Sequence, residues 1–572
     1  MLSQPIHPVR YLYDRKVPMR DGIKLSADVY LPRGGKIFPT LLLRTPYEST
    51  LEMHVEWGVW WAKRGYACVI VDDRGRFESE GIFYAYHDDG RDGHDTLEWI
   101  GNQNWCNGKI GMSGRSYGGI VQWQAAPYRS KHLTAIAPQV IMGDYFADCH
   151  RIGGAVQWAL TIFAALTFST AVTLTQRGSK HIFGNQNFYR HLPLITADME
   201  AIGREIPFYR DWCTHVCRDD YWEQINTFRV LDQINVPAVQ QAAWYDPYTA
   251  SMFRLWNGMR ERSYSEHARR NQKIYVIPWT HHIPESSKLG DLDFGPTGYV
   301  DLNAEDLRWF DYWLKGIDTG IIAEPPIKLF VMGENVWRFE NEWPLARTKF
   351  TPYYFHSNGH AHTLYGDGTL DEEPPANEPP DKFSYDPANP VPTLGGNNST
   401  WTLMKFAADQ IFPGPLDQRP LERRDDVLVY TSRVLEHDVE VTGPLEVVLY
   451  AASSARDTDF TAKLLDVHPN GFAIHLAEGI LRARHRKNLE DVEFLQPNEV
   501  EEYRIELAPT SNLFKTGHRL RVEISSSNFP RFDRNLNTGG DIFRDTDMQI
   551  AHQTILHNSA YPSHILLPII PR

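Results

Sequence analysis

The stretch Gly114-Arg115-Ser116-Tyr117-Gly118 decides the fold, because it matches the pattern G-x-S-x-G. In this pattern a serine sits on a sharp turn between a strand and a helix, with small residues where a side chain would clash. Residues 109–113 before it have the character of a short strand, and residues 120–126 after it have helical character. A chance match has a probability on the order of 0.2 in a chain of this length, but strand, turn and helix in this order are what a nucleophile elbow requires. The sequence therefore predicts an α/β-hydrolase sheet with Ser116 as its nucleophile.

Composition bounds the class of protein and its partners. The chain has 572 residues, of which 42% are hydrophobic, so it is long enough for roughly two to four domains with large cores. Its formal net charge of −14, with no basic cluster, predicts that it has no nucleic-acid partner. Five cysteines are few and odd in number, which favours a reducing compartment, so we expect a cytoplasmic location.

Two segments have an alternative interpretation. Residues 152–176 carry no charge, but their Gly, Gln, Ser and Thr content weakens the signal for a membrane span, so we expect a buried helix that lines a pocket.

The run Cys213-Thr214-His215-Val216-Cys217 is similar to a small metal-ligand cluster but lacks a second half. We therefore expect no membrane span, no metal and no cofactor. A homo-oligomer is compatible with the sequence.

Strands and helices alternate at both ends of the first 320 residues. Residues 40–45 and 67–72 are short apolar runs typical of strands buried on both faces, and hence of a parallel sheet. The chain then becomes helical and rich in aromatic residues, resumes the alternation, and ends in a long β-rich part typical of an antiparallel sandwich. We therefore predict four parts: an α/β-hydrolase domain at 1–142, a helical cap insertion at 143–236, the rest of the hydrolase domain at 237–324, and a β-sandwich at 325–572.

Hydrolysis by a serine needs a base, an acid that orients the base, and donors for the oxyanion. In α/β-hydrolases the acid and the histidine follow the serine in that order, each after the carboxyl end of a strand. Asp246 follows the predicted strand near residue 239, and its loop holds no other carboxylate. His281 and His282 follow the strand that ends near residue 277. Position and order thus select Asp246 and one of these two histidines.

The residues themselves identify one of the two expected oxyanion donors. Tyr117 directly follows the predicted nucleophile, so its backbone N–H is one expected donor. The other donor should come from the loop after an early strand, where residues 44–48 contain no glycine run. The hydroxyl of Tyr47 could donate there, which would contribute roughly 3–4 kcal/mol to the transition state. From the residues alone, we interpret Tyr47 as a packed aromatic ring with a hydrated hydroxyl and not as an oxyanion donor.

The chain resembles the cocaine esterase and X-Pro dipeptidyl-peptidase-like hydrolases, the CocE/NonD family, which include glutaryl acylases and α-amino-acid ester hydrolases. The resemblance runs from about residue 19 to residue 568 and continues into the β-rich part. The motifs that carry it are Met19-Arg20-Asp21-Gly22, Asp73-Arg74-Gly75-Arg76, Ser79-Glu80-Gly81, residues 107–111, residues 114–119, Pro278-Trp279-Thr280-His281, residues 386–392 and residues 526–533.

The resemblance implies an α/β-hydrolase domain, a helical cap and a C-terminal jelly roll of the galactose-binding-like type. Carried over by position, it implies Ser116 as nucleophile and Asp246 as orienting acid. It favours His281 over His282 as base, because His281 directly follows the Pro-Trp-Thr run. It also implies that Tyr47 and the Tyr117 N–H form the oxyanion hole, which reverses the interpretation of Tyr47 from the residues alone.

The substrate is less sharply defined. We expect the cap and the loop after Asp246 to wall the acyl pocket, with Trp158, Phe163 and Tyr248 as lining candidates. We favour an esterase acting on a small-molecule ester or amide. The alternatives are X-Pro dipeptidyl-peptidase activity and α-amino-acid ester or β-lactam acylase activity, and outside the enzymes a carbohydrate-binding protein. An α-ammonium substrate would need a carboxylate cluster, for which the candidates are Asp144, Asp148, Asp219 and Asp220.

Overall fold

A ten-stranded sheet carries the first half of the protein, in the order β1-β2-β4-β3-β5-β6-β9-β10-β13-β14. The computed structural model describes residues 2–169, 186–282, 284–399 and 412–572. The strands from β4 to β13 in this order pair in parallel, and the outer strands pair antiparallel. Their bounds are β1 (Val9–Pro18), β2 (Lys24–Pro32), β3 (Phe38–Thr45), β4 (Ala67–Asp72), β5 (Cys106–Arg115), β6 (Leu133–Gln139), β9 (Ala238–Tyr245), β10 (Gln272–Thr280), β13 (Ile327–Val331) and β14 (Val336–Glu340).

Helices cover both faces of this sheet, which explains why its central strands are continuous apolar runs. On one face, Trp61 and Phe310 pack with residues of β3 and β4 such as Leu41 and Ile70. On the other face, α2, α3 and α11 pack against β5, β6, β9 and β10. The helices are α1 (Glu52–Ala62) and α13 (Leu302–Lys315) on the first face, and α2 (Asp89–Gly101), α3 (Tyr117–Ala125) and α11 (Thr249–Arg262) on the second. The short α12 (Glu266–Arg270) follows α11, and its His267 ring packs against Trp313 of α13.

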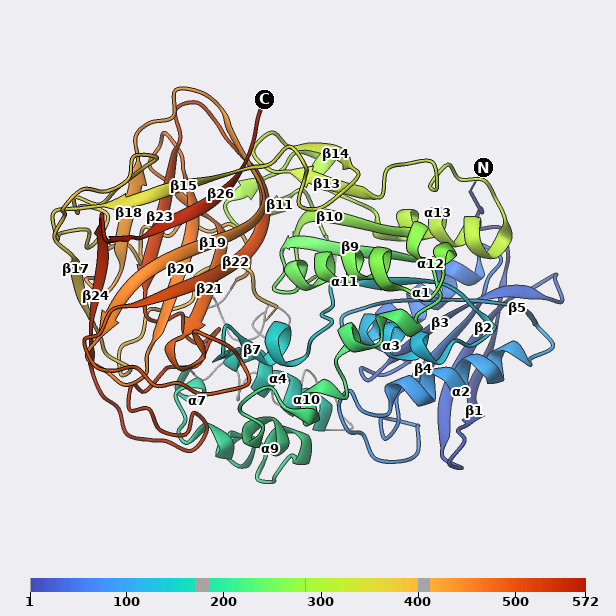
Figure 1. Ribbon diagram of the computed structural model, residues 1–572. Coiled ribbons are helices and arrows are strands. Elements are labelled where there is room, and N and C mark those ends of the chain that lie inside the picture. The colour runs from blue at the N-terminus through green and yellow to red at the C-terminus, as the bar shows by residue number, and fades with distance from the viewer. Residues whose placement is uncertain (1, 170–185, 283, 400–411) are drawn as a thin grey trace.

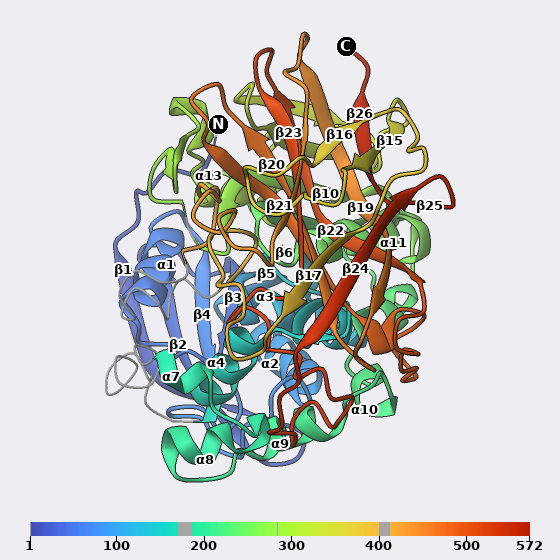
Figure 2. The same cartoon turned by 90° about the vertical axis from the view of Figure 1, so that its left-hand side faces the viewer.

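Between β6 and β9 the chain leaves the sheet and forms a helical cap. In both views the cap lies at one end of the molecule, below the sheet and the β-rich part (Figures 1 and 2). The predicted buried helix appears as α4, and the rest of that prediction, from residue 170, lies outside the described residues. No helix in the described ranges is long and apolar enough to cross a membrane. The cap elements are η2 (Phe146–His150), β7 (Arg151–Ile152), β8 (Ala155–Val156), α4 (Trp158–Ser169), α7 (Gln186–Tyr189), η3 (Leu194–Thr196), α8 (Ala197–Ile202), α9 (Pro207–Thr214), α10 (Asp220–Glu223), η4 (Thr227–Arg229) and η5 (Leu231–Gln233).

The second half of the chain folds into one twelve-stranded, mainly antiparallel sheet that wraps into a sandwich beside the first domain (Figure 1). The strand order is β17-β24-β19-β26-β15-β16-β18-β23-β20-β21, with β22 paired to β19 and β25 to β24. The bounds are β15 (Lys349–His356), β16 (Thr369–Asp371), β17 (Asp381–Tyr385), β18 (Leu428–Ser432), β19 (Val439–Ser453), β20 (Asp459–Val467), β21 (Ala473–Arg482), β22 (Glu501–Phe514), β23 (Arg519–Ser525), β24 (Ala551–Asn558), β25 (Tyr561–Pro562) and β26 (His564–Ile570).

The architecture agrees with the predicted fold class: an α/β-hydrolase domain with an inserted helical cap, followed by an all-β domain. One feature differs in position. Strands β13 and β14 belong to the first sheet, although they lie beyond residue 324, where the sequence analysis ends the hydrolase part. Short strands with partly apolar faces suit either sheet, and only the parallel pairing of β13 with β10 places them in the first one.

Candidate active site

Ser116 lies at the turn between β5 and α3, with backbone angles φ 55° and ψ −124°. A non-glycine residue in this region costs on the order of 1–3 kcal/mol, so surrounding packing must hold it there. A Cβ on Gly114 would lie 2.8 Å from the Gly118 carbonyl oxygen, and one on Gly119 would lie 2.5 Å from Ile141. Gly114 and Gly119 therefore leave no room for a side chain at this turn. The Ser116 carbonyl accepts the first helical hydrogen bond, from Gly119 N at 2.8 Å.

Asp246 and His281 come together because their strands are neighbours. β9 and β10 pair in parallel with Tyr245 opposite Thr280, so the residue after each strand lies at the same edge of the sheet. His281 Nδ1 lies 2.5 Å from Asp246 Oδ2, and the other carboxylate oxygen accepts from Tyr248 N at 2.8 Å. Asp246 is fully buried. The carboxylate is thus held at both oxygens, and the hydrogen bond at Nδ1 leaves Nε2 of His281 to accept a proton.

Arg115, the variable residue of the elbow, reaches the loop that carries His281. Its Nε donates to the His281 carbonyl at 2.7 Å and an Nη to the His282 carbonyl at 2.6 Å, and it also bonds Gln139 Oε1 at 3.3 Å. Burial lowers the pKa of Arg115 to about 10, so it stays cationic at neutral pH. The sequence did not indicate a role for this residue, because nothing in the motif shows which loop its side chain meets. These contacts place the turn of Ser116 directly beside the His281 loop.

Tyr47 lies just beyond β3, and β3 is the direct neighbour of β5. Burial raises the pKa of Tyr47 to about 12, and interactions with the Ser116 side chain and the Tyr117 backbone act in the opposite direction. The Tyr47 hydroxyl therefore lies against the serine side chain and the first N–H of α3. The side chain of Tyr117 points elsewhere: its hydroxyl donates to Asp89 Oδ2 at 2.7 Å and is buried. Only the backbone of Tyr117 faces the site.

Arg76, known from the sequence only as part of a motif, fixes the Tyr47 loop. Its Nε donates to the Pro46 carbonyl at 2.9 Å, and its Nη1 donates to the Phe168 carbonyl at 2.8 Å. One guanidinium thus joins the loop before Tyr47 to the last turn of α4. The Tyr47 ring also packs against Phe168, with centroids 5.8 Å apart. The cap and the loop of Tyr47 are therefore held together.

The three predicted pocket residues lie in different surroundings. Tyr248 is nearly buried, and its ring meets the His281 ring edge-on, with centroids 5.6 Å apart. Trp158 is fully buried in the cap, where its indole N–H donates to the Tyr189 carbonyl at 2.9 Å. Phe163 is half-buried and packs against the core. Of the three, Tyr248 is thus shown in contact with a predicted catalytic side chain.

Three of the four cap carboxylates that could receive an α-ammonium group already have partners. Asp144 forms an ion pair with Arg218, and Asp148 forms one with Arg254 and accepts from Ser251. His215, from the short cysteine run, lies 2.6 Å from Asp219. Asp220 is exposed at the start of α10. Of the four candidates, the two buried carboxylates are therefore neutralised by arginines.

The sandwich domain supports the loop of Asp246, which the sequence did not indicate. Asn397 Nδ2 donates to the Trp244 carbonyl at 2.5 Å, and the Tyr245 hydroxyl donates to the His475 carbonyl at 3.1 Å. The buried Arg531 pairs with Glu478 and lies near enough to Asp246 to interact with its charge. Residues that immediately precede Asp246 are therefore anchored to the second domain.

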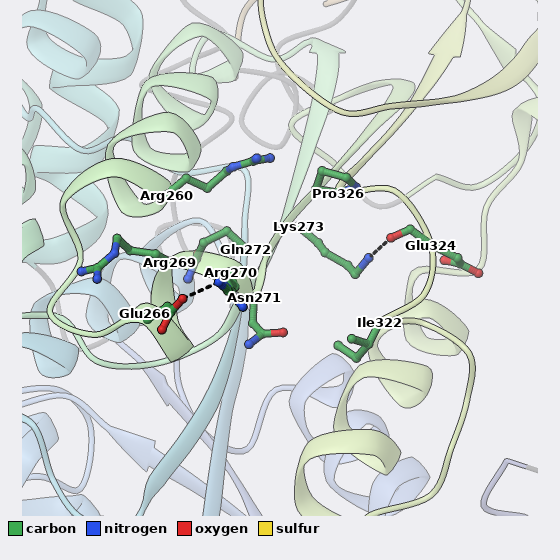
Figure 3. Close-up of a pocket in the computed structure, with 10 residues that line it drawn as sticks. All are labelled: Arg260, Glu266, Arg269, Arg270, Asn271, Gln272, Lys273, Ile322, Glu324 and Pro326. Carbon is green, nitrogen blue, oxygen red and sulfur yellow. Dashed lines mark hydrogen bonds and ion pairs between the residues drawn. The ribbon is translucent and has the colours of Figure 1, made fainter.

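A cavity of about 560 Å³ lies away from these residues, at the amino end of β10 (Figure 3). Figure 3 shows Arg270 paired with Glu266, and Lys273 directed toward Glu324, whose backbone carbonyl it reaches at 2.7 Å. Lys273 and His281 are eight positions apart, which is about 26 Å along a strand that rises about 3.3 Å per residue. This cavity belongs to the opposite end of the sheet and is not part of the candidate active site.

Known proteins resemble this chain over both of its domains. Residues 21–282 match the X-Pro dipeptidyl-peptidase (S15) family, and residues 319–566 match the X-Pro dipeptidyl-peptidase C-terminal non-catalytic domain. A cocaine esterase from Rhodococcus sp. is 38% identical over 97% of this chain and 98% of its own length. The chain belongs to the X-Pro dipeptidyl-peptidase (S15) family. It is therefore a serine hydrolase with a C-terminal non-catalytic domain.

Further similar proteins match most or all of the chain. A putative serine esterase from Mycobacterium tuberculosis is 26% identical over 90% of both chains. Among solved structures, an α-amino acid ester hydrolase superposes with a TM-score of 0.83 at 25% identity, covering 100% of this chain and 98% of its own. An aminopeptidase from a Thaumarchaeota archaeon gives a TM-score of 0.84 at 24% identity, covering 100% and 97%, which supports the fold. Both domains are thus shared as a unit.

Proposed function

We propose that this serine hydrolase cleaves carboxylic esters of small molecules through an acyl-enzyme intermediate. The observation that carries the proposal is the Asp246–His281 pair at the edge of the sheet where Ser116 and Tyr47 also lie. We assign Ser116 as nucleophile, His281 as base and Asp246 as the acid that orients it. Tyr47 and the Tyr117 N–H are the proposed oxyanion donors.

The geometry supports a two-step reaction. His281 Nε2 takes the proton of the Ser116 hydroxyl as its oxygen attacks the ester carbonyl, and Asp246 stabilises the imidazolium that forms. The Tyr47 hydroxyl and the Tyr117 N–H donate to the tetrahedral oxyanion. His281 then gives its proton to the leaving alcohol, and a water molecule, activated in the same way, releases the acid and restores Ser116.

Two observations favour an ester over the alternatives. The relative that is 38% identical along nearly the whole chain is named a cocaine esterase, and the Mycobacterium tuberculosis relative is named a putative serine esterase. An α-ammonium substrate needs an unpaired carboxylate, whereas Asp144 and Asp148 are paired with Arg218 and Arg254. Peptidase and acylase activities remain the competing proposals. Membership of a hydrolase family counts against the carbohydrate-binding alternative.

The remaining assignments are also proposals. We retain residues 143–236 as the cap, which with Tyr248 would wall the acyl pocket. The five cysteines are unpaired, which supports a reducing compartment such as the cytoplasm. The net charge of −14 supports a small-molecule substrate rather than a nucleic acid.

A substrate panel with matched variants tests the proposal. The panel comprises p-nitrophenyl acyl esters of increasing length, Ala-Pro-p-nitroanilide, an α-amino-acid methyl ester and a glutaryl amide. We expect turnover of the acyl esters with a burst of p-nitrophenol. Ser116→Ala and His281→Ala should each lower kcat by about 10⁴-fold or more. His282→Ala is the matched control and should retain activity.

Each part of the proposal has its own contrary outcome. Cleavage of the proline anilide alone would make the chain a peptidase. Equal losses in His281→Ala and His282→Ala would remove His281 as the specific base. Full activity in Ser116→Ala would refute the acyl-enzyme mechanism.

A further inference from the structure

Two histidines and one aspartate gather at one end of the sandwich, where β20 and β23 pair antiparallel. The register sets Asp466 opposite Leu520 and Val467 opposite Arg519. One step further, His468 faces His518 across the two chains, and their ring centroids lie 4.5 Å apart. Side chains alternate along a strand, so residues 466 and 468 point to the same face. We call Asp466, His468 and His518 the rim cluster.

The rim cluster lies where an apolar face ends. Leu464 and Val522, on the same face, are fully buried in the hydrophobic core. Exposure then rises toward the strand ends: the side chains are 6% exposed for Asp466, 13% for His518 and 27% for His468. The cluster is therefore anchored on a rigid sheet at one side and open to solvent at the other. An ion can reach it without opening the core.

The spacing of the polar atoms suits a small divalent cation. His518 Nδ1 lies 2.7 Å from Asp466 Oδ1, and His468 Nε2 lies 3.7 Å from Asp466 Oδ2. One ligand atom from each residue lies within 4.8 Å of the others. With bonds of about 2.0–2.2 Å, two ligands of a tetrahedral zinc ion are about 3.4 Å apart. Small side-chain rotations therefore suffice to place all three atoms around one ion.

We propose that the rim cluster binds one borderline divalent cation of the Zn²⁺ class, with water as the fourth ligand. Imidazole nitrogen and carboxylate oxygen are ligands that such ions accept, and a site with three protein ligands keeps one position open. The sequence predicts no metal in this chain, since the Cys213–Cys217 run lacks a second half, and it does not single out these two histidines, which are fifty positions apart. The sheet register alone makes them neighbours.

Binding should also tie the sheet together. The ion would link the end of β20 to the start of β23, in addition to their backbone hydrogen bonds. A ligand that binds only the folded state raises the free energy of unfolding by an amount that grows with the logarithm of its concentration relative to Kd. We therefore expect zinc to raise the midpoint of thermal unfolding.

A second cluster of histidines and acids provides the matched control. His356 Nδ1 lies 2.8 Å from Glu378 Oε1, and its Nε2 lies 3.1 Å from the Glu373 carbonyl oxygen. His557 likewise has a carboxylate at each ring nitrogen, from Glu378 and Asp381. Both nitrogens of these rings are already occupied. Replacement of His356 removes one histidine of the same chemistry without touching the rim cluster.

The experiment titrates the metal-stripped full-length protein with Zn²⁺ by calorimetry, and with Co²⁺ by visible absorption. We expect one ion per chain and the absorption of a tetrahedral Co²⁺ site. Loss of a residue that only hydrogen-bonds to a metal ligand already costs about 10- to 100-fold in affinity. His468→Ala and His518→Ala should therefore weaken binding at least about 100-fold and abolish the zinc-dependent rise in unfolding temperature. His356→Ala should bind like the parent protein.

The outcomes that overturn the proposal are distinct from those that bear on hydrolysis. Unchanged affinity in both rim variants would place any bound zinc elsewhere, with His281 and His282 as the alternative ligands. If the titrations give neither a binding heat with Zn²⁺ nor a Co²⁺ absorption band, the rim cluster binds no such ion and is a purely structural hydrogen-bonded group. Ester hydrolysis and circular dichroism of the rim variants should match the parent and show that they fold. A failure of the proposed ester hydrolysis would leave the metal result unaffected.

Discussion

The Tyr47 hydroxyl has two interpretations at the level of a single residue, and its surroundings favour one of them. The residue is half-buried, and its hydroxyl interacts with the Ser116 side chain and the backbone of Tyr117. A phenol is a useful oxyanion donor only while it keeps its proton. Since burial raises the pKa of Tyr47 to about 12, the neutral form persists well above physiological pH. Burial thus favours the protonated Tyr47 hydroxyl of the folded protein at pH values below about 12. This preference is lost as the pH rises through about 12.

We expect Tyr47→Phe to lower kcat for p-nitrophenyl esters by about 10²- to 10³-fold, as for removal of one oxyanion donor. KM should change little, because the donor acts mainly in the transition state. Steady-state kinetics check both values. Tyr275→Phe, which also removes a buried hydroxyl but in a strand remote from the elbow, should retain activity.

The parent enzyme should also show no loss of kcat/KM from ionisation of Tyr47 up to about pH 10, two units below the raised pKa. A decline below that pH that disappears in Tyr47→Phe would contradict the prediction, as would a kcat unchanged by the substitution.

At the level of elements, the Arg115 side chain connects the end of β5 to the loop after β10. Arg115 ends β5, yet its guanidinium binds the carbonyls of residues 281 and 282, which follow β10. Hydrogen bonds from a charged donor are roughly twice as strong as neutral ones. Arg115 is therefore expected to act as a positioning residue that holds His281 relative to Ser116.

We expect Arg115→Met to lower kcat by about 10- to 100-fold, because a misplacement of about 1 Å in a catalytic group costs up to about 100-fold. KM should move much less. Arg115→Lys should recover part of the loss, since an ammonium can still reach one carbonyl. Steady-state kinetics of both variants give the split between kcat and KM.

Arg129→Met serves as the control, because Arg129 lies beyond α3 and stacks on Tyr264. Equal activity of Arg115→Met and the parent enzyme would contradict the positioning role of Arg115. A loss that appears only in stability, with unchanged kcat, would make Arg115 a structural residue.

At the level of the whole molecule, the buried carboxyl of Asp306 makes the free energy of unfolding depend on pH. Asp306, on α13, is buried and accepts from Ser113 at 3.1 Å, Gln139 at 3.1 Å and Gln241 at 2.5 Å. Burial raises the pKa of Asp306 to about 8. The folded protein therefore keeps a proton near neutral pH that the unfolded chain, with an ordinary carboxyl, releases.

The free energy of unfolding should consequently fall as pH rises, from about pH 4 through about pH 8, where Asp306 ionises in the folded state. One such proton contributes a slope of up to about 1 kcal/mol per pH unit. Asp306→Asn, which stays neutral, should reduce the slope by that amount. Urea unfolding at pH 5, 7 and 9 measures it. An unchanged slope in the variant would show that Asp306 is already ionised.

Much of the fold and of the candidate site was accessible from the sequence because those features are local. Apolar runs such as residues 67–72 mark strands buried on both faces, and the glycines around Ser116 mark a turn that only small residues permit. The order of Ser116, Asp246 and His281 follows from the order of strands. Tyr47 needed the family resemblance, because a tyrosine after a strand has no distinctive local pattern.

The sequence by itself determined the elements, their order and the residue types available for hydrolysis, because backbone geometry and side-chain periodicity act over a few residues. Only the tertiary structure decided which distant groups meet. Arg115 reaches a carbonyl 166 positions away, and His468 meets His518, because sheet order and strand register set those contacts. The support of the Asp246 loop by the sandwich domain has the same origin. Such contacts depend on how completed elements pack, which no short stretch of sequence encodes.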